Sequence, residues 1–304
     1  MNRLTSFVCS RGQHLLNNKK HAIMYVVFLA LLPYTTWISV ALVALVTLRR
    51  GALAGGWLLA YAMLAHLTLS MLSLHFNIAL LNTVLVYMPC FIAAMVLRST
   101  VSLRAACSAF IIQVLVVVMI IQYFMPELMV AQYLYFQSVL KELKGDGAVF
   151  AIFGDDGQLN QMIYASYLLG LQALGVVTSA GVSLMMARKV QSNLYFPGEF
   201  KREILAFRGE KIEFLCLLII LAAAYQQNLL AMSLVPVLIL YFLLAGLALS
   251  FYVFAKQKPL PVVIMLLVPL VFLPFIMLPL YVVFGSLDSV FNFRSYLISD
   301  AGKV

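Results

Sequence analysis

The stretch from Ala22 to Leu48 decides the fold: it reads AIMYVVFLALLPYTTWISVALVALVTL, 27 residues without one charged side chain. Roughly 20 mostly apolar residues are enough for a helix to cross a bilayer. Further apolar segments follow along the chain, at Ala52–Leu72, Phe76–Leu97, Leu103–Phe124, Gln161–Ala187, Ile212–Gln226, Leu229–Ala255 and Leu260–Phe284. They are continuously apolar, without the alternation of an outer-membrane β-strand. The sequence therefore predicts an all-α, polytopic transmembrane helix bundle.

The composition points the same way, because 64% of the residues are hydrophobic and only 10% are charged, far from the balance of a soluble domain. The longest gaps, 125–160 and 188–211, are too short for a separate soluble domain of usual size. We therefore expect one integral membrane domain over residues 1–304. It has a cytoplasmic arm at 1–21, an external loop at 125–160 and a cytoplasmic interfacial helix within 188–211.

The net charge of +9 indicates membrane topology rather than a nucleic-acid partner, because Lys and Arg collect on the cytoplasmic side of membrane proteins. This charge distribution predicts a multi-pass protein with its N-terminus in the cytoplasm. Arg49 and Arg50 would then lie on the wrong side if the first segment were a single span. Pro33 interrupts that segment, since proline removes a helical donor, and two re-entrant half-helices would return both arginines to the inside.

The resulting bundle has about seven spans plus a broken or re-entrant first segment; two full but thin spans are the alternative. A tight turn at Tyr225–Asn228 separates two further segments. The last segment, Leu260–Phe284, is expected to be one span bent by its prolines, which places Arg294 outside.

Two loop segments show the spacing of amphipathic helices. The external one carries an apolar stripe, formed by Met129, Tyr133, Phe136, Leu140 and Leu143. It is either a helix packed on the bundle or a lid over a substrate cavity. The internal one is either a membrane-surface anchor, with basic residues facing anionic headgroups, or a docking helix for a cytoplasmic partner. Its candidate contact residues are Pro197, Gly198, Phe200, Lys201, Arg202, Phe207 and Arg208.

Sequence motifs for catalysis, nucleotide binding or metal binding are missing: there is no Walker A motif, no G-x-G-x-x-G, no H-E-x-x-H and no G-x-S-x-G. We therefore expect no enzyme activity and no cofactor. Charged residues are also missing from the predicted membrane interior, where they usually mark ion or proton pathways. A substrate site would then use neutral groups, and its candidates are His66, Asn82, Gln113, Gln122 and Gln172. For each of them the alternative is an interhelical hydrogen bond, which is the more frequent role of such residues.

The stretch Ala187-Arg188-Lys189-Val190-Gln191-Ser192-Asn193-Leu194-Tyr195-Phe196-Pro197-Gly198-Glu199-Phe200, with Glu203 after it, resembles a motif of the YybS-like family of bacterial inner-membrane proteins. That motif runs Ala-Arg…Gln-Ser…Leu-Tyr-Asn-Pro-Gly-Gly-Phe, so Phe196 and Glu199 depart from it. The family is itself distantly similar to the substrate-binding subunits of energy-coupling-factor transporters. The resemblance implies a location in the bacterial inner (plasma) membrane and a binding subunit that has no motor of its own.

The leading hypothesis is a transporter-like, substrate-binding membrane subunit for a small neutral solute or a lipid, energised by a partner protein. The alternative is a non-transporting scaffold or assembly factor that recruits a cytoplasmic partner through the internal basic helix.

Overall fold

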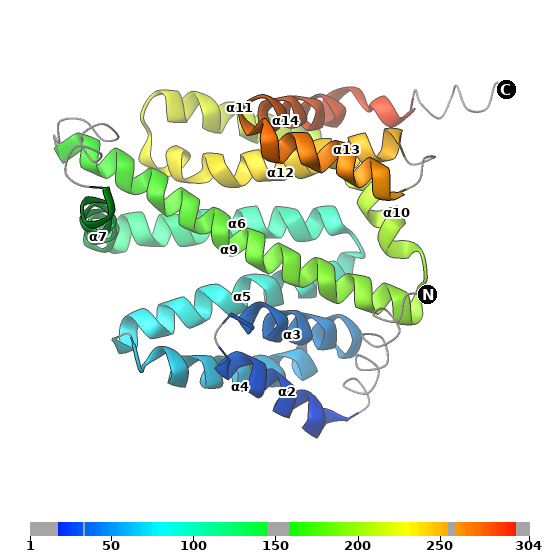
Figure 1. Cartoon of the computed structure of the whole chain (residues 1–304), viewed down its shortest axis with the longest axis horizontal. Coiled ribbons are helices and arrows are strands. Elements are labelled where there is room, and N and C mark those ends of the chain that lie inside the picture. Colours follow the sequence, from blue (N-terminus) through cyan, green and yellow to red (C-terminus); the bar gives the residue numbers. More distant parts are fainter. Residues whose placement is uncertain (1–17, 33, 74, 145–157, 255–258, 296–304) are drawn as a thin grey trace. The chain divides into compact units, whose positions relative to one another are not determined.

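The computed structural model describes residues 18–32, 34–73, 75–144, 158–254 and 259–295, and the regular elements within these ranges are all helices (Figure 1). Among the described residues, six helices are long and apolar enough to cross a membrane. They are α4 (Ala52–Ser70), α5 (Phe76–Thr100), α6 (Leu103–Phe124), α9 (Gln158–Tyr195), α12 (Leu229–Val253) and α14 (Pro274–Phe291). The predicted fold class is confirmed: the protein is an all-helical, multi-pass membrane protein.

The helices belong to two compact units. Unit 1 comprises residues 1–110 and 176–206, and unit 2 comprises residues 111–175 and 207–304. Both α6 and α9 contribute residues to each unit. The predicted single membrane domain stays a prediction. Most of the predicted cytoplasmic arm (1–17), Pro33 and residues 145–157 of the predicted external loop lie outside the described residues.

The first apolar segment is broken, as predicted, into α2 (Lys19–Leu31) and α3 (Thr36–Arg50). Ser39 Oγ donates a hydrogen bond to the carbonyl of Val26 (3.1 Å), and Thr35 Oγ1 donates one to the carbonyl of Leu29 (2.7 Å). In each pair the two residues lie at similar distances along the chain from the break, one before it and one after it. The two helices therefore form an antiparallel hairpin. At 1.5 Å per residue each helix is about 20 Å long, shorter than the roughly 30 Å hydrocarbon core.

The rest of unit 1 packs tightly around this hairpin. A Cβ atom added to Gly55 of α4 would overlap the side chain of Thr47 in α3, so the two helices are in close contact there. Tyr87 of α5 donates a hydrogen bond to Ser39 Oγ (3.2 Å). Ser183 of α9 donates one to the carbonyl of Trp37 (2.9 Å). Small and hydroxyl side chains thus permit close contact between these helices.

Unit 2 is organised around α12. A Cβ atom at Gly246 of α12 would overlap the carbonyl oxygen of Tyr281 in α14, and one at Gly285 would overlap the carbonyl oxygen of Phe242. The two backbones therefore touch. α11 (Lys211–Tyr225) precedes α12 and ends at the predicted tight turn, where Gln227 has a φ of +60° and Asn228 caps α12.

The last apolar segment is also a hairpin, which corrects the expectation of a single bent span. It divides into α13 (Pro259–Phe272) and α14, with Pro274 starting the second helix. Tyr281 Oη donates a hydrogen bond to the carbonyl of Leu266 (3.0 Å) across the two helices. Because the chain turns back, Arg294 does not lie on the far side as expected. Its Nη2 donates to the carbonyl of Phe207, just before α11 (2.7 Å).

The helix in the predicted external loop is α7 (Pro126–Lys144). Met129 and Tyr133 of the predicted apolar stripe are buried, but Phe136 is exposed and Gln137 is buried in its place. Gln137 Nε2 donates to Tyr133 Oη (2.7 Å), which satisfies the amide on the buried face. The buried stripe thus has the spacing i, i+4 and i+8, with Gln137 in third place. The prediction had Phe136 there, at i+7.

Candidate ligand site in unit 1

The α2–α3 hairpin returns Arg50 to the place where α2 begins. Lys19, the first residue of α2, and Arg50, the last of α3, line the same pocket of about 280 Å³. The first turns of α4 complete its wall with Ala54, Trp57, Leu58 and Tyr61, and Ala22, Ile23 and Val46 add aliphatic surface. We call this the hairpin pocket.

The walls of the hairpin pocket are mostly apolar, and the nine described lining residues include no acidic side chain. Lys19 and Arg50 supply its cationic groups, both on exposed residues. Trp57 is 70% exposed, so the pocket opens at the surface of the unit. An apolar pocket with a few convergent polar groups is the usual form of a small-molecule site, although this one is at the small end of the range.

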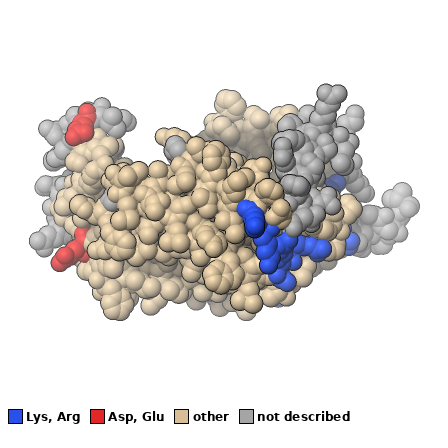
Figure 2. Space-filling model, turned by 90° about the horizontal axis from the view of Figure 1, so that it is seen from below, with Lys and Arg blue, Asp and Glu red and all other residues tan. Residues whose placement is uncertain are grey.

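Further basic groups surround the ends of these helices. Arg98 at the end of α5 donates from Nη1 to the carbonyl of Thr47 in α3 (3.0 Å). The guanidinium of Arg49 lies 4.0 Å from the ring centroid of Tyr195, the last residue of α9. We call Lys19, Arg49, Arg50 and Arg98 the basic end of unit 1. Basic side chains also gather in one area of the face drawn in Figure 2.

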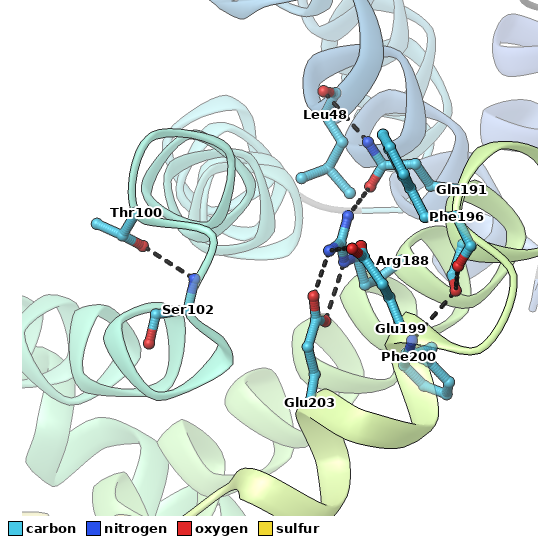
Figure 3. Close-up of polar contacts among 10 residues, drawn as sticks. Leu48, Thr100, Ser102, Arg188, Gln191, Phe196, Glu199, Phe200 and Glu203 are labelled. Carbon is cyan, nitrogen blue, oxygen red and sulfur yellow. Dashed lines mark hydrogen bonds and ion pairs between the residues drawn. The ribbon is translucent and has the colours of Figure 1, made fainter.

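The motif residues of the internal loop form a second polar cluster in unit 1, centred on Arg188 of α9 (Figure 3). Arg188 is only 5% exposed. Its Nε donates to Glu203 Oε2 (3.0 Å), its Nη2 also pairs with the other carboxylate oxygen of Glu203, and its Nη1 donates to Gln191 Oε1 (2.7 Å). Gln191 in turn donates to the carbonyl of Leu48 at the end of α3 (3.5 Å). The cluster therefore fastens α9 and α10 (Glu199–Ala206) to the hairpin.

The Pro-Gly pair of the motif makes the turn between α9 and α10. Glu199 N donates to the carbonyl of Phe196 (3.1 Å) and Gly198 has a φ of +95°, the geometry of a type II turn with proline second and glycine third. Ser192 Oγ donates to the carbonyl of Phe196 and accepts from the amide of Phe200. Pro197 thus lies in the turn between α9 and α10.

The predicted partner-docking residues divide into exposed and buried ones. Pro197, Gly198, Lys201 and Arg202 are exposed, and Phe200 is half-buried. Phe207 and Arg208 belong to unit 2. There Phe207 is buried in edge-to-face contact with Tyr241, and Arg208 is half-buried.

The predicted substrate residues do not gather in one pocket. None of His66, Asn82, Gln113, Gln122 and Gln172 lines the hairpin pocket. His66 is buried and hydrogen-bonded through Nδ1 to Thr83 Oγ1 (2.9 Å), and Gln122 Nε2 donates to the carbonyl of Leu229 and to Ser233 Oγ (3.0 Å). Both therefore make interhelical hydrogen bonds. Asn82 and Gln172 are exposed and Gln113 is half-buried.

Sequence reasoning missed the hairpin pocket residues. Lys19 and Arg50 are 31 positions apart and were assigned only to topology, although the predicted re-entrant hairpin already implied that they meet. Trp57 and Tyr61, four residues apart on α4, gave a further signal of a shared helix face.

At one end of unit 2, a buried ion pair holds the chain after α14. Arg294 Nε donates to Asp288 Oδ2 (3.1 Å), and Asp288 is fully buried within the last turn of α14. Burial lowers the pKa of Arg294 from its ordinary value, and the nearby Asp288 carboxylate opposes that shift. Sequence reasoning placed Asp288 beyond the membrane segments, because the apolar run ends at Phe284.

No protein family, curated protein or solved structure matches this chain. The resemblance to the YybS-like family therefore rests on its motif residues and stays a prediction.

Proposed function

We propose that this membrane protein is a transporter-like binding subunit that holds a small solute or a lipid in the hairpin pocket and depends on a partner protein for energy. The observation that carries the proposal is the pocket itself, about 280 Å³ with aliphatic and aromatic walls and two cationic groups. The missing nucleotide-binding motifs support a separate source of energy.

The direct test compares two substitutions on the same helix, α4. Ala54→Phe places a ring in the hairpin pocket, whereas Ala60→Phe places the same ring on an exposed position of α4 that does not line it. Thermal stability of the purified protein is measured against a panel of vitamins and lipids in neutral detergent. We expect at least one compound to stabilise the wild-type and Ala60→Phe proteins but not the Ala54→Phe protein. No stabilisation by any compound, or an equal effect on all three proteins, contradicts the proposal.

A scaffold function is the second candidate, and it rests on α10. This eight-residue helix exposes Lys201 and Arg202, while its Glu203 is paired with the buried Arg188. A photo-crosslinker placed at Lys201 tests it. One cytoplasmic protein captured in stoichiometric amount, and lost on Arg202→Glu substitution, supports the scaffold; crosslinks to lipid alone count against it.

A further inference from the structure

We infer that the ligand of the hairpin pocket is an anionic lipid, with its phosphate between Lys19 and Arg50 and the start of an acyl chain along Trp57 and Tyr61. This inference rests on the proposed binding function and specifies its ligand class. It follows from the charge, the depth and the size of the pocket.

The charge of the pocket favours an anion. Lys19 and Arg50 are its two charged lining residues, and no acidic residue lines it among those described. α2 and α4 both begin at the pocket, which adds the positive ends of two helix dipoles. The negative end of the α3 dipole also lies here, and it is partly offset because Arg98 and Gln191 donate hydrogen bonds to the carbonyls of Thr47 and Leu48.

The depth of the pocket fits an amphiphile that lies across the membrane interface. The basic residues stand at the helix ends, and Tyr61 lies nine residues into α4, about 14 Å further along the helix axis. Trp57 and Tyr61 have the amphipathic rings that collect at the headgroup level of bilayers. The pocket therefore runs from headgroup depth toward the acyl region.

The size of the pocket excludes a fully enclosed lipid and favours a partly inserted one. A volume of about 280 Å³ accommodates a headgroup and the first part of a chain. The outer surface of α4 continues the apolar path, because Leu53 and Leu64 are 86% and 60% exposed. The remainder of the lipid would lie on this surface in contact with the bilayer.

Quenching of Trp57 fluorescence by brominated lipids tests the inference. Trp37→Phe leaves Trp57 as the single tryptophan, because the chain has two. The full-length protein is placed in nanodiscs of unbrominated phosphatidylcholine doped with brominated phosphatidylglycerol or brominated phosphatidylcholine. We expect half-maximal quenching at about thirtyfold lower mole fraction of the anionic lipid, as two basic residues near a lipid surface predict.

Charge-matched variants identify the source of the preference. Lys19→Gln with Arg50→Gln should remove it, whereas Lys201→Gln with Arg202→Gln, the same charge change on exposed residues of α10, should keep it. Equal quenching by both lipids in the wild-type background overturns the anionic ligand. Loss of the preference in millimolar inorganic phosphate, with no such loss in equimolar chloride, also overturns it, because the site then takes free phosphate.

The same nanodiscs separate this inference from the proposed function. If both lipids quench equally and Ala54→Phe weakens both, the pocket binds lipid without selecting charge: the inference fails and the binding function stands. If Ala54→Phe changes quenching by neither lipid and no compound stabilises the protein, both the inference and the proposed function fail.

Discussion

Arg188 and Arg294 are both buried, and each is held by a carboxylate of its own unit. Taking a charge out of water costs several kcal/mol unless a partner and further hydrogen bonds compensate. Arg188 has Glu203 and Gln191, and Arg294 has Asp288 and the carbonyl of Phe207. The first pair fastens α10 to α9, and the second fastens the chain after α14 to the last turn of that helix.

Removing one partner of such a pair is expected to be costly. Glu203→Gln leaves the buried Arg188 without its bidentate carboxylate, and we expect the free energy of unfolding to fall by about 3 kcal/mol. Glu199→Gln is the matched control, because Glu199 lies 3.5 Å from Arg188 with its side chain 46% exposed; we expect a loss below about 1 kcal/mol. Unfolding in mixed micelles measures both, and losses of equal size would refute the assigned roles.

The sequence placed Arg188 in a basic loop but did not predict its ion pair with Glu203. Glu203 lies 15 positions away, beyond a turn whose direction depends on Gly198. The contact of Arg294 with the carbonyl of Phe207 was missed for a different reason, because the expected single last span put Arg294 on the side opposite Phe207. Pairings of this kind follow from tertiary contacts that local spacing does not encode.

Two helical hairpins, α2–α3 and α13–α14, begin and end the described chain. The first was predicted because charge and Pro33 agreed. The second was missed because its prolines gave no clear signal: Pro269 and Pro279 lie inside helices, whereas Pro274 starts one. A proline in an apolar run therefore predicts a disturbance of the helix but does not distinguish a kink from a break.

The contact between α12 and α14 depends on two glycines, and their substitution is a sharp test of this packing. Gly246→Ala or Gly285→Ala puts a methyl group against a backbone carbonyl of the other helix, so we expect each to destabilise the protein by about 1–3 kcal/mol. In α9, Gly175 has open space around its Cα, and Gly175→Ala should be neutral or slightly stabilising. Thermal unfolding followed by size exclusion compares them. Equal changes in stability for all three substitutions would show that the close contact between α12 and α14 is wrong.

On the scale of the whole molecule, the presence of several apolar spanning helices was predictable, but their number and their topology were only partly so. Length and composition predict spanning helices directly, and six are found in the described part of the chain. In unit 1, the ends of α3, α5 and α9 meet through Arg98, Arg49 and Gln191. The hairpin pocket depends on the reversal of the first segment, because only the α2–α3 hairpin brings Lys19 to Arg50.

The membrane side on which single cysteines react tests the α2–α3 hairpin most directly. Cys9, Cys90, Cys107 and Cys216 are replaced by serine, and one cysteine is introduced at Asn18, Arg49, Ser295 or Ser73. A membrane-impermeant maleimide is applied to vesicles of each orientation. We predict that Asn18→Cys, Arg49→Cys and Ser295→Cys react from one side and Ser73→Cys from the other. Reaction of Arg49→Cys from the side of Ser73→Cys would contradict the first hairpin, and with it the hairpin pocket.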